Sequence, residues 1–381
     1  MYRPVLAACI LLTASAASAQ DVPATDDTVA FPDELILLPE DVQRDAETGG
    51  LDPETAEVPT GMTAAQQAWY RAQMAFVADD WYLARRYAET AAAAGIADAA
   101  ALAGLMARDG RGGERDIAAS VRWFRRAAEQ DHPVALYQLG LLARLGDDSL
   151  DLGPPRRWFE RAARAGHIEG MVAYALALKA SPVPQDALSA RRWAERAAQQ
   201  ESAEGMYQLA QMLDEGIGGD RDADGARIWY ERAARANLAE GAFQAGMMWA
   251  DGEGGPQDDA EALRWLRIAA ESDYAPAQGQ YGLMLYQGRG GETDHEAAAY
   301  WFGRGARGGD AESQYLYAFA LAQGDGVDQD LEEAYRWVVA AGTDALGAPV
   351  HNRDRDRLQA ALERVLPLDV QARMREAGTA D

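Results

Sequence analysis

Large aromatic residues recur along this chain at an almost constant interval. Tryptophans follow one another at spacings of 35 or 36 residues, and Tyr87 extends the series by 36 residues toward the N-terminus. A period of roughly 20–50 residues is typical of stacked repeats, in which each unit buries its apolar face only against its neighbours. The pattern predicts eight units, anchored at Tyr87, Trp123, Trp158, Trp193, Trp229, Trp265, Trp301 and Trp337.

An aspartate stands seven residues before every anchor and predicts the start of a helix there. A carboxylate at that point accepts the free backbone N–H groups of the first turn and interacts favourably with the helix dipole. In the third unit, Pro154 and Pro155 are expected to delay the helix by a residue or two. The predicted caps are Asp80, Asp116, Asp151, Asp186, Asp222, Asp258, Asp294 and Asp330.

A second helix is predicted in each unit from a row of small residues seventeen positions past the anchor, such as Gly140, Ala175 and Gly282. Between the two helices, eight positions past the anchor, stand residue types that tolerate the left-handed backbone that ends a helix. Glu201 is the exception there. Each unit is therefore expected to be a helical hairpin, with an anchor helix and a small-residue helix, and the fold class all-α.

Three short motifs resemble a known family. They are residues 135–140, which read ALYQLG, the turn Gly324-x-Gly326-Val327-x-x-Asp330, and the segment Glu333-Ala334-x-x-Trp337. Together they are similar to the Sel1-like repeats, relatives of the tetratricopeptide repeats. The resemblance covers residues 63–342 and implies a right-handed α-solenoid of about eight Sel1-like hairpins that acts as an interaction scaffold.

The first nineteen residues have the pattern of a secretory signal. Arg3 precedes an apolar run over residues 5–13, and small residues lead to a cleavage point between Ala19 and Gln20. A rival interpretation is a lipoprotein signal ending at Cys9, which would leave an unusually short apolar core. After residue 19 no stretch is long and apolar enough to span a membrane. The mature protein is therefore expected in the periplasm or outside the cell.

Two segments flank the predicted repeats. Residues 20–62 are rich in proline and in acidic residues and are expected to form a disordered tail. Between residues 21 and 57 there are twelve acidic residues, and Arg44 is the only basic one. Residues 343–381 are expected to form C-terminal capping helices, with Leu358, Leu362 and Val365 at helical spacing.

Charge and cysteine content exclude several functions. The net charge of -25 disfavours nucleic acid and anionic lipid as partners. Cys9 is the only cysteine and leaves with the signal, so a disulfide, a thiolate nucleophile and a thiolate metal site are not expected. No G-x-S-x-G motif, phosphate-binding glycine loop or serine–lysine pair occurs. We therefore expect no enzyme and no cofactor.

One motif suggests a metal site. Residues 220–231 match the calcium-loop pattern D-x-D-x-D-G-x5-E, with the ligand types that calcium prefers. The repeat register instead makes the second aspartate of this motif a helix cap, so the acids are equally explained by a surface hairpin. The candidate ligands are Asp220, Asp222, Asp224 and Glu231.

Two rows of side chains on the small-residue helices are candidates for partner binding. A row of amides can hydrogen-bond an extended peptide, and a row of aromatic rings supplies contact area. In similar solenoids these helices line the concave groove, although the family often has amides there for structural reasons. The candidates are Tyr137, Gln138, Tyr207, Gln208, Phe243, Gln244, Gln280 and Tyr315.

Arginines form another row, on the anchor helices. Arg192 and Arg196, four positions apart around Trp193, illustrate the pattern. Such a row is typical of a solvated outer face whose arginines pair with local acids. An alternative is that the acidic tail lies along this row.

These patterns favour a monomeric scaffold, adaptor or regulator in the bacterial cell envelope that binds another envelope protein or peptide. Two alternatives stay open, a calcium-responsive module and an envelope hydrolase. β-Lactamase-like activity has been described for cysteine-rich Sel1-like relatives, whose cysteines this sequence lacks.

Overall fold

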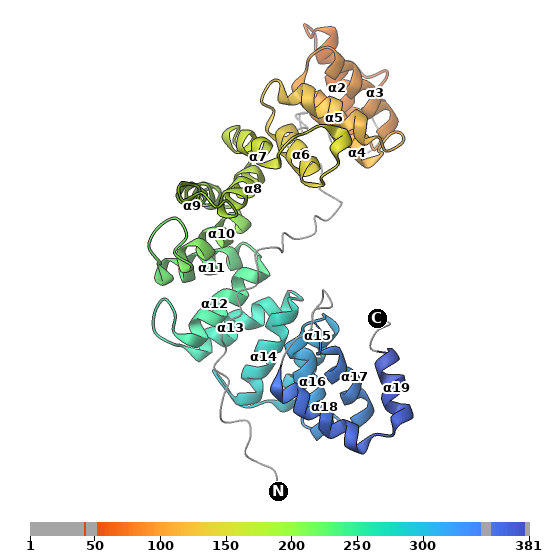
Figure 1. The fold of residues 1–381 in the computed structure, drawn as a ribbon. Coiled ribbons are helices and arrows are strands. Elements are labelled where there is room, and N and C mark those ends of the chain that lie inside the picture. The colour runs from red at the N-terminus through yellow and green to blue at the C-terminus, as the bar shows by residue number, and fades with distance from the viewer. Residues whose placement is uncertain (1–41, 43–51, 344–351, 378–381) are drawn as a thin grey trace. The chain divides into compact units, whose positions relative to one another are not determined.

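A computed structural model describes residue 42 and residues 52–343 and 352–377, and all its elements are helices. The fold is an α-solenoid, as predicted (Figure 1). The signal, most of the acidic tail and the extreme C-terminus lie outside the described residues.

The described helices alternate between the two predicted kinds. The anchor helices are α3 (Trp81–Ala93), α5 (Ile117–Ala128), α7 (Pro155–Arg164), α9 (Pro184–Gln199), α11 (Ala223–Arg235), α13 (Asp259–Glu271), α15 (His295–Arg307) and α17 (Leu331–Ala340). The small-residue helices are α4 (Ala97–Asp109), α6 (Pro133–Arg144), α8 (Ile168–Lys179), α10 (Ala203–Asp214), α12 (Ala239–Asp251), α14 (Ala275–Gln287) and α16 (Ala311–Gln323). The remaining elements are α2 (Ala64–Val77), the short 3-10 helix η2 (Asp148–Leu150), α18 (Arg353–Val365) and α19 (Leu368–Ala377).

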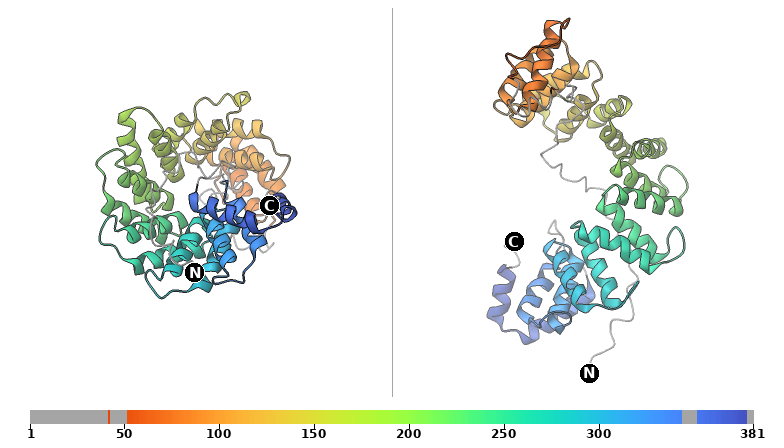
Figure 2. Two further views of the ribbon diagram at one scale, coloured as in Figure 1. Left: turned by 60° about the horizontal axis from the view of Figure 1, so that its bottom comes forward. Right: turned by 180° about the vertical axis from the view of Figure 1, so that it is seen from behind.

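The described residues form two compact units, which divide between residues 135 and 136. In the first, α2, α3, α4 and α5 pack one against the next. In the second, consecutive helices from α7 to α17 do the same, and α18 and α19 cover α17 (Figure 2). Leu362 of α18 is buried, as its helical spacing suggested, whereas Val365 is exposed because the helix ends there.

The predicted caps are correct at six of the eight positions. At Asp294, for example, the carboxylate accepts the N–H of Ala297 at 2.9 Å. Asp151 and Asp186 do not cap. Prolines set these two helix starts instead, since α7 begins at Pro155 and α9 at Pro184. Asp186 therefore lies inside the first turn of α9 and binds Arg156.

The turns after the anchor helices α3 to α15 have the predicted left-handed backbone, and the equivalent position after α17 lies outside the described residues. Glu201, whose residue type did not predict it, also has a positive φ of 61°. The position in the repeat therefore determines the conformation even where the residue type is unfavourable, because the two helices of the hairpin must reverse direction there.

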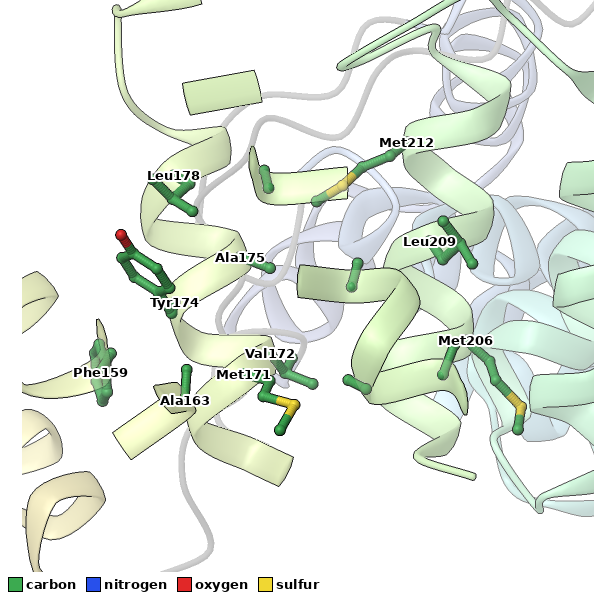
Figure 3. Close-up of a cluster of buried hydrophobic side chains, with 14 of the residues drawn as sticks. Phe159, Ala163, Met171, Val172, Tyr174, Ala175, Leu178, Met206, Leu209 and Met212 are labelled. Atoms are coloured by element: carbon green, nitrogen blue, oxygen red, sulfur yellow. The ribbon is translucent and has the colours of Figure 1, made fainter. Parts of the chain in front are cut away.

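The core lies between the hairpins. Its fully enclosed large side chains include Phe124 and Leu266, which stand one position after an anchor, while Trp193 and Trp229 are only partly buried. Figure 3 shows one such core cluster in the second unit, with Leu178 of α8 and Met212 of α10 among its residues. Glycines allow the close packing: a Cβ on Gly140 would lie 2.5 Å from Cδ1 of Phe159. The core therefore requires small residues opposite large ones.

Candidate functional site

The predicted binding rows lie on α6, α10, α12, α14 and α16, but the amides are less accessible than expected. Gln138 is 2% exposed and Gln208 is 7% exposed. Gln244 and Gln280 are half-buried. A buried amide cannot meet a peptide backbone without rearrangement, so at Gln138 and Gln208 the geometry favours the structural interpretation.

Two of the glutamine amides donate hydrogen bonds to carboxylates that were not among the predicted site residues. Nε2 of Gln208 donates to Oε1 of Glu204 at 2.8 Å, within α10. Nε2 of Gln280 on α14 donates to Oε2 of Glu312 on α16 at 3.1 Å, so this bond joins successive small-residue helices. Glu240 occupies the equivalent position on α12. These acids stand eleven positions after the anchors, and that regular spacing was the signal that could have revealed them.

The aromatic row is continued by a ring outside the predicted set. Phe243 of α12 packs edge-on against Tyr274, the residue before α14, with ring centroids 5.4 Å apart. Tyr207 of α10 packs against the core residue Tyr230 at 5.6 Å. Phe243 and Tyr207 are half-buried. The rings are therefore fixed by packing while part of each remains at the surface.

We call this surface of the second unit the ladder face. It runs over four successive repeats and combines half-buried rings, amides and carboxylates with one buried amide. It is defined by Glu204, Tyr207, Gln208, Glu240, Phe243, Gln244, Tyr274, Gln280, Glu312 and Tyr315.

Burial and mutual repulsion perturb the acids and phenols of the ladder face. Burial raises the pKa of the Glu204 carboxyl, and the charge of Glu240 adds to this while the hydrogen bond from Gln208 opposes it. The pKa of Glu312 is raised by burial and by Asp310, against the hydrogen bond from Gln280.

The phenols respond in the same direction. Burial, Tyr274 and the charges of Glu204 and Glu240 raise the pKa of Tyr207. Burial raises the pKa of Tyr315 to about 12, with a further contribution from Asp354. The ladder face is thus an environment in which negative charge is unfavourable.

The remaining predicted residues, Tyr137 and Gln138, lie on α6. The Tyr137 ring stacks on the imidazole of His167 with centroids 4.6 Å apart and also packs near Phe159. This packing places Tyr137 in the junction with the next repeat.

The structure does not bring together the four candidate calcium ligands, Asp220, Asp222, Asp224 and Glu231. Asp222 caps α11 by accepting the N–H of Gly225 at 2.9 Å. Glu231 lies two turns along that helix and accepts from Arg235 at 2.9 Å and from Nε1 of Trp249 at 3.0 Å. In the ranges that the structure describes, no three His, Cys, Asp or Glu side chains could hold a metal ion.

The arginine row has local partners. Arg264 stacks 4.5 Å from the Trp265 ring centroid and pairs with Glu261, and Arg336 stacks 4.3 Å from that of Trp337. These contacts favour the interpretation as an outer face with internal partners. Whether the acidic tail lies along the row falls outside the described residues, apart from its last part.

Within that last part, residues 52–59 contact helices α2 and α3. Arg71 of α2 donates to the carbonyl oxygen of Pro53 at 2.5 Å, and Pro53 is buried. Glu54 pairs with Arg86 of α3 at 2.6 Å. Residues 52–59 thus lie against α2 and α3, a contact that the sequence did not predict.

One pocket of about 370 Å³ opens on the anchor-helix side of the second unit, near the end of α15. Its lining pairs Arg304 with Asp273, and Arg307 adds a further positive charge. Tyr300 beside them is 58% exposed. These groups form a polar depression in which no nucleophile is placed beside a base.

Comparison with known proteins identifies the repeats. The model of the Sel1 repeat matches residues 97–132, 156–167, 169–202, 203–238, 239–274, 275–310 and 311–341. A search of curated proteins found no match.

Solved structures also resemble the fold. A Sel1 repeat protein from Oxalobacter formigenes is 24% identical, with a TM-score of 0.62, over 84% of this chain and 90% of that one. A protective antigen from uropathogenic Escherichia coli that displays the same repeat fold is 19% identical, with a TM-score of 0.48, over 90% of this chain and 94% of that one. The first of these likenesses supports the same fold for this chain.

Proposed function

Because this chain belongs to the Sel1 repeat family, whose members are generally protein-interaction scaffolds, we propose that it is an adaptor or regulator in the bacterial cell envelope that binds a protein through the ladder face. The observation that carries the proposal is a row of half-buried rings over four successive repeats, with half-buried carboxylates beside the rings in three of them. Fixed aromatic rings bind with little loss of conformational freedom, which makes them frequent energetic centres of interfaces.

The mechanism is complementarity of shape and charge, with no bond made or broken. The repeat fold is typically non-catalytic, and in the described part of the chain no helix is both long and apolar enough to cross a membrane.

The envelope location rests on the signal pattern of residues 1–19. Cell fractionation and N-terminal sequencing test it, with mature protein expected to start at Gln20.

The binding surface is tested by replacing Tyr207 and Phe243 with alanine. A partner captured by the wild-type protein should bind this variant at least tenfold more weakly, since two interface rings are lost. The control replaces Tyr300, which is exposed on the anchor helix α15, and should bind normally. Equal loss of binding in the control, or none in the double variant, would rule out the ladder face. Light scattering tests the proposed monomer.

A further inference from the structure

The charge on the ladder face is not balanced within the face. Among the described residues, the charged groups that act on Glu204 and Glu312 are the carboxylates Glu240 and Asp310, respectively. The same holds for Tyr274, whose charged neighbours are again Glu240 and Asp310. Half-buried carboxylates that repel one another are stabilised by a cation that enters between them.

A second observation points to a missing donor at the same place. Gln208 is 7% exposed, and its Oε1 atom has no hydrogen-bond partner among the described residues. Its Nε2 atom is directed at Glu204, so turning the amide over would bring Oε1 against the carboxylate. A buried acceptor without a donor costs about 1–3 kcal/mol. Once the Gln208 side chain turns toward the surface, a guanidinium beside Glu204 could donate both to the carboxylate and to this acceptor.

The rings complete the requirements for a cation. Tyr207, Phe243 and Tyr274 flank the acids, and ring faces attract guanidinium and ammonium groups. The anchor helices of the second unit already use this interaction internally, for example where Arg232 lies 4.5 Å from the Trp229 ring centroid. The acids and rings of the ladder face offer the same interaction to a partner.

From this arrangement we propose that the ladder face binds a cationic, extended segment of the partner, whose arginine or lysine side chains pair with Glu204, Glu240 and Glu312 between the aromatic rings. This inference rests on the proposed function and specifies the partner's chemistry. Successive like helices are about 10 Å apart, and an extended chain advances about 3.3 Å per residue. With one basic residue in every three, such a segment would reach Glu204 and Glu240 on successive repeats and Glu312 two repeats further on, because α14 has Pro276 at the equivalent position.

The test uses a labelled dodecapeptide with arginine at every third position, titrated into the full-length protein by fluorescence anisotropy. The variant is Glu204→Gln, Glu240→Gln and Glu312→Gln, which keeps the size and hydrogen-bonding capacity of each side chain. We expect binding to wild type and at least tenfold weaker binding to the variant. A matched control changes three exposed acids on anchor helices to glutamine, namely Glu195, Glu271 and Glu332, and should bind as wild type does.

Three results would overturn the inference: no binding of the arginine peptide to wild type, equal binding to the glutamine variant, or an equal loss in the control. Circular dichroism melting establishes that the variants are folded. The proposed function and this inference can be distinguished by experiment. If a captured partner loses affinity on Tyr207→Ala and Phe243→Ala but not on the three glutamine changes, the surface is correct and its cationic specificity is wrong.

Discussion

At the scale of single residues, the repeat register explains most side chains better than isolated motifs do. Asp222 is part of a complete calcium-loop match, yet it caps α11 as Asp294 caps α15. Because a motif of acids and glycine also describes a helix start after a turn, the sequence match alone could not distinguish the two.

The cap contribution can be measured at Asp294. Replacing Asp294 by alanine should destabilise the start of α15 by about 1 kcal/mol, because the N–H of Ala297 loses its acceptor. Amide hydrogen exchange in the first turn of α15 is the measurement. Asp294→Asn retains a capping oxygen and should exchange nearly as wild type does. Equal exchange in the alanine variant would contradict the cap assignment.

Close packing between repeats can be tested at Gly140. A methyl group there would meet the Phe159 ring, so Gly140→Ala should lower the free energy of unfolding by about 1–3 kcal/mol. The change Phe159→Leu removes the ring edge, and in that background Gly140→Ala should cost less. Chemical denaturation of the four proteins gives the coupling. Additive effects would show that the two residues do not press on each other.

At the scale of elements, the sequence predicted the order of helices because one physical signal repeats in every unit. It failed where a local signal competed. Pro184 starts α9 two residues before Asp186, and a proline at the first helical position needs no N–H acceptor, so the aspartate became free to bind Arg156.

The binding surface was only partly predictable. Periodicity placed Tyr207, Phe243 and the glutamines on one kind of helix, but it carries no information on how deeply each is buried. The difference between Gln208, which is buried, and Gln244, which is half-buried, arises from contacts between helices. In the sequence, acids such as Glu204 are indistinguishable from ordinary first-turn residues, whose negative charge interacts favourably with the helix dipole. Only the hydrogen bonds from the glutamines set them apart.

The ladder acids predict a pH dependence of stability. A carboxyl whose pKa is higher in the folded chain than its unfolded value near 4.5 binds more protons when folded, so stability falls as pH rises through the folded pKa. Glu204→Gln with Glu312→Gln should therefore be more stable than wild type at pH 7.5, and the advantage should shrink toward pH 4.5. Thermal melts across this range measure it. A difference that does not change with pH would contradict the burial of these charges.

The contact of residues 52–59 with the first unit depends on Arg71. Arg71→Ala should release this segment, because the carbonyl oxygen of Pro53 loses its donor. Faster amide exchange at Thr55 and Ala56 is expected, since their N–H groups bond within this turn. Arg86→Ala removes only an exposed ion pair with Glu54 and should have a smaller effect. If the two variants increased amide exchange equally, the ion pair between Arg86 and Glu54 would be as important for this contact as Arg71.

At the scale of the whole molecule, the two kinds of helix provide different chemistry. The anchor helices cover their tryptophans with the chain's own arginines, as at Arg336 and Trp337. The small-residue helices of the second unit present rings beside carboxylates that lack such partners. A scaffold of this kind satisfies one surface internally and leaves the other to a binding partner.

Photo-crosslinking in cells shows whether the ladder face is the protein-binding surface. A photoreactive phenylalanine analogue is placed at Gln244 on the ladder face or at Tyr300, which is 58% exposed on α15. We expect a discrete crosslinked partner from position 244 and none from position 300. The same partner crosslinked from position 300, with none from position 244, would contradict this expectation.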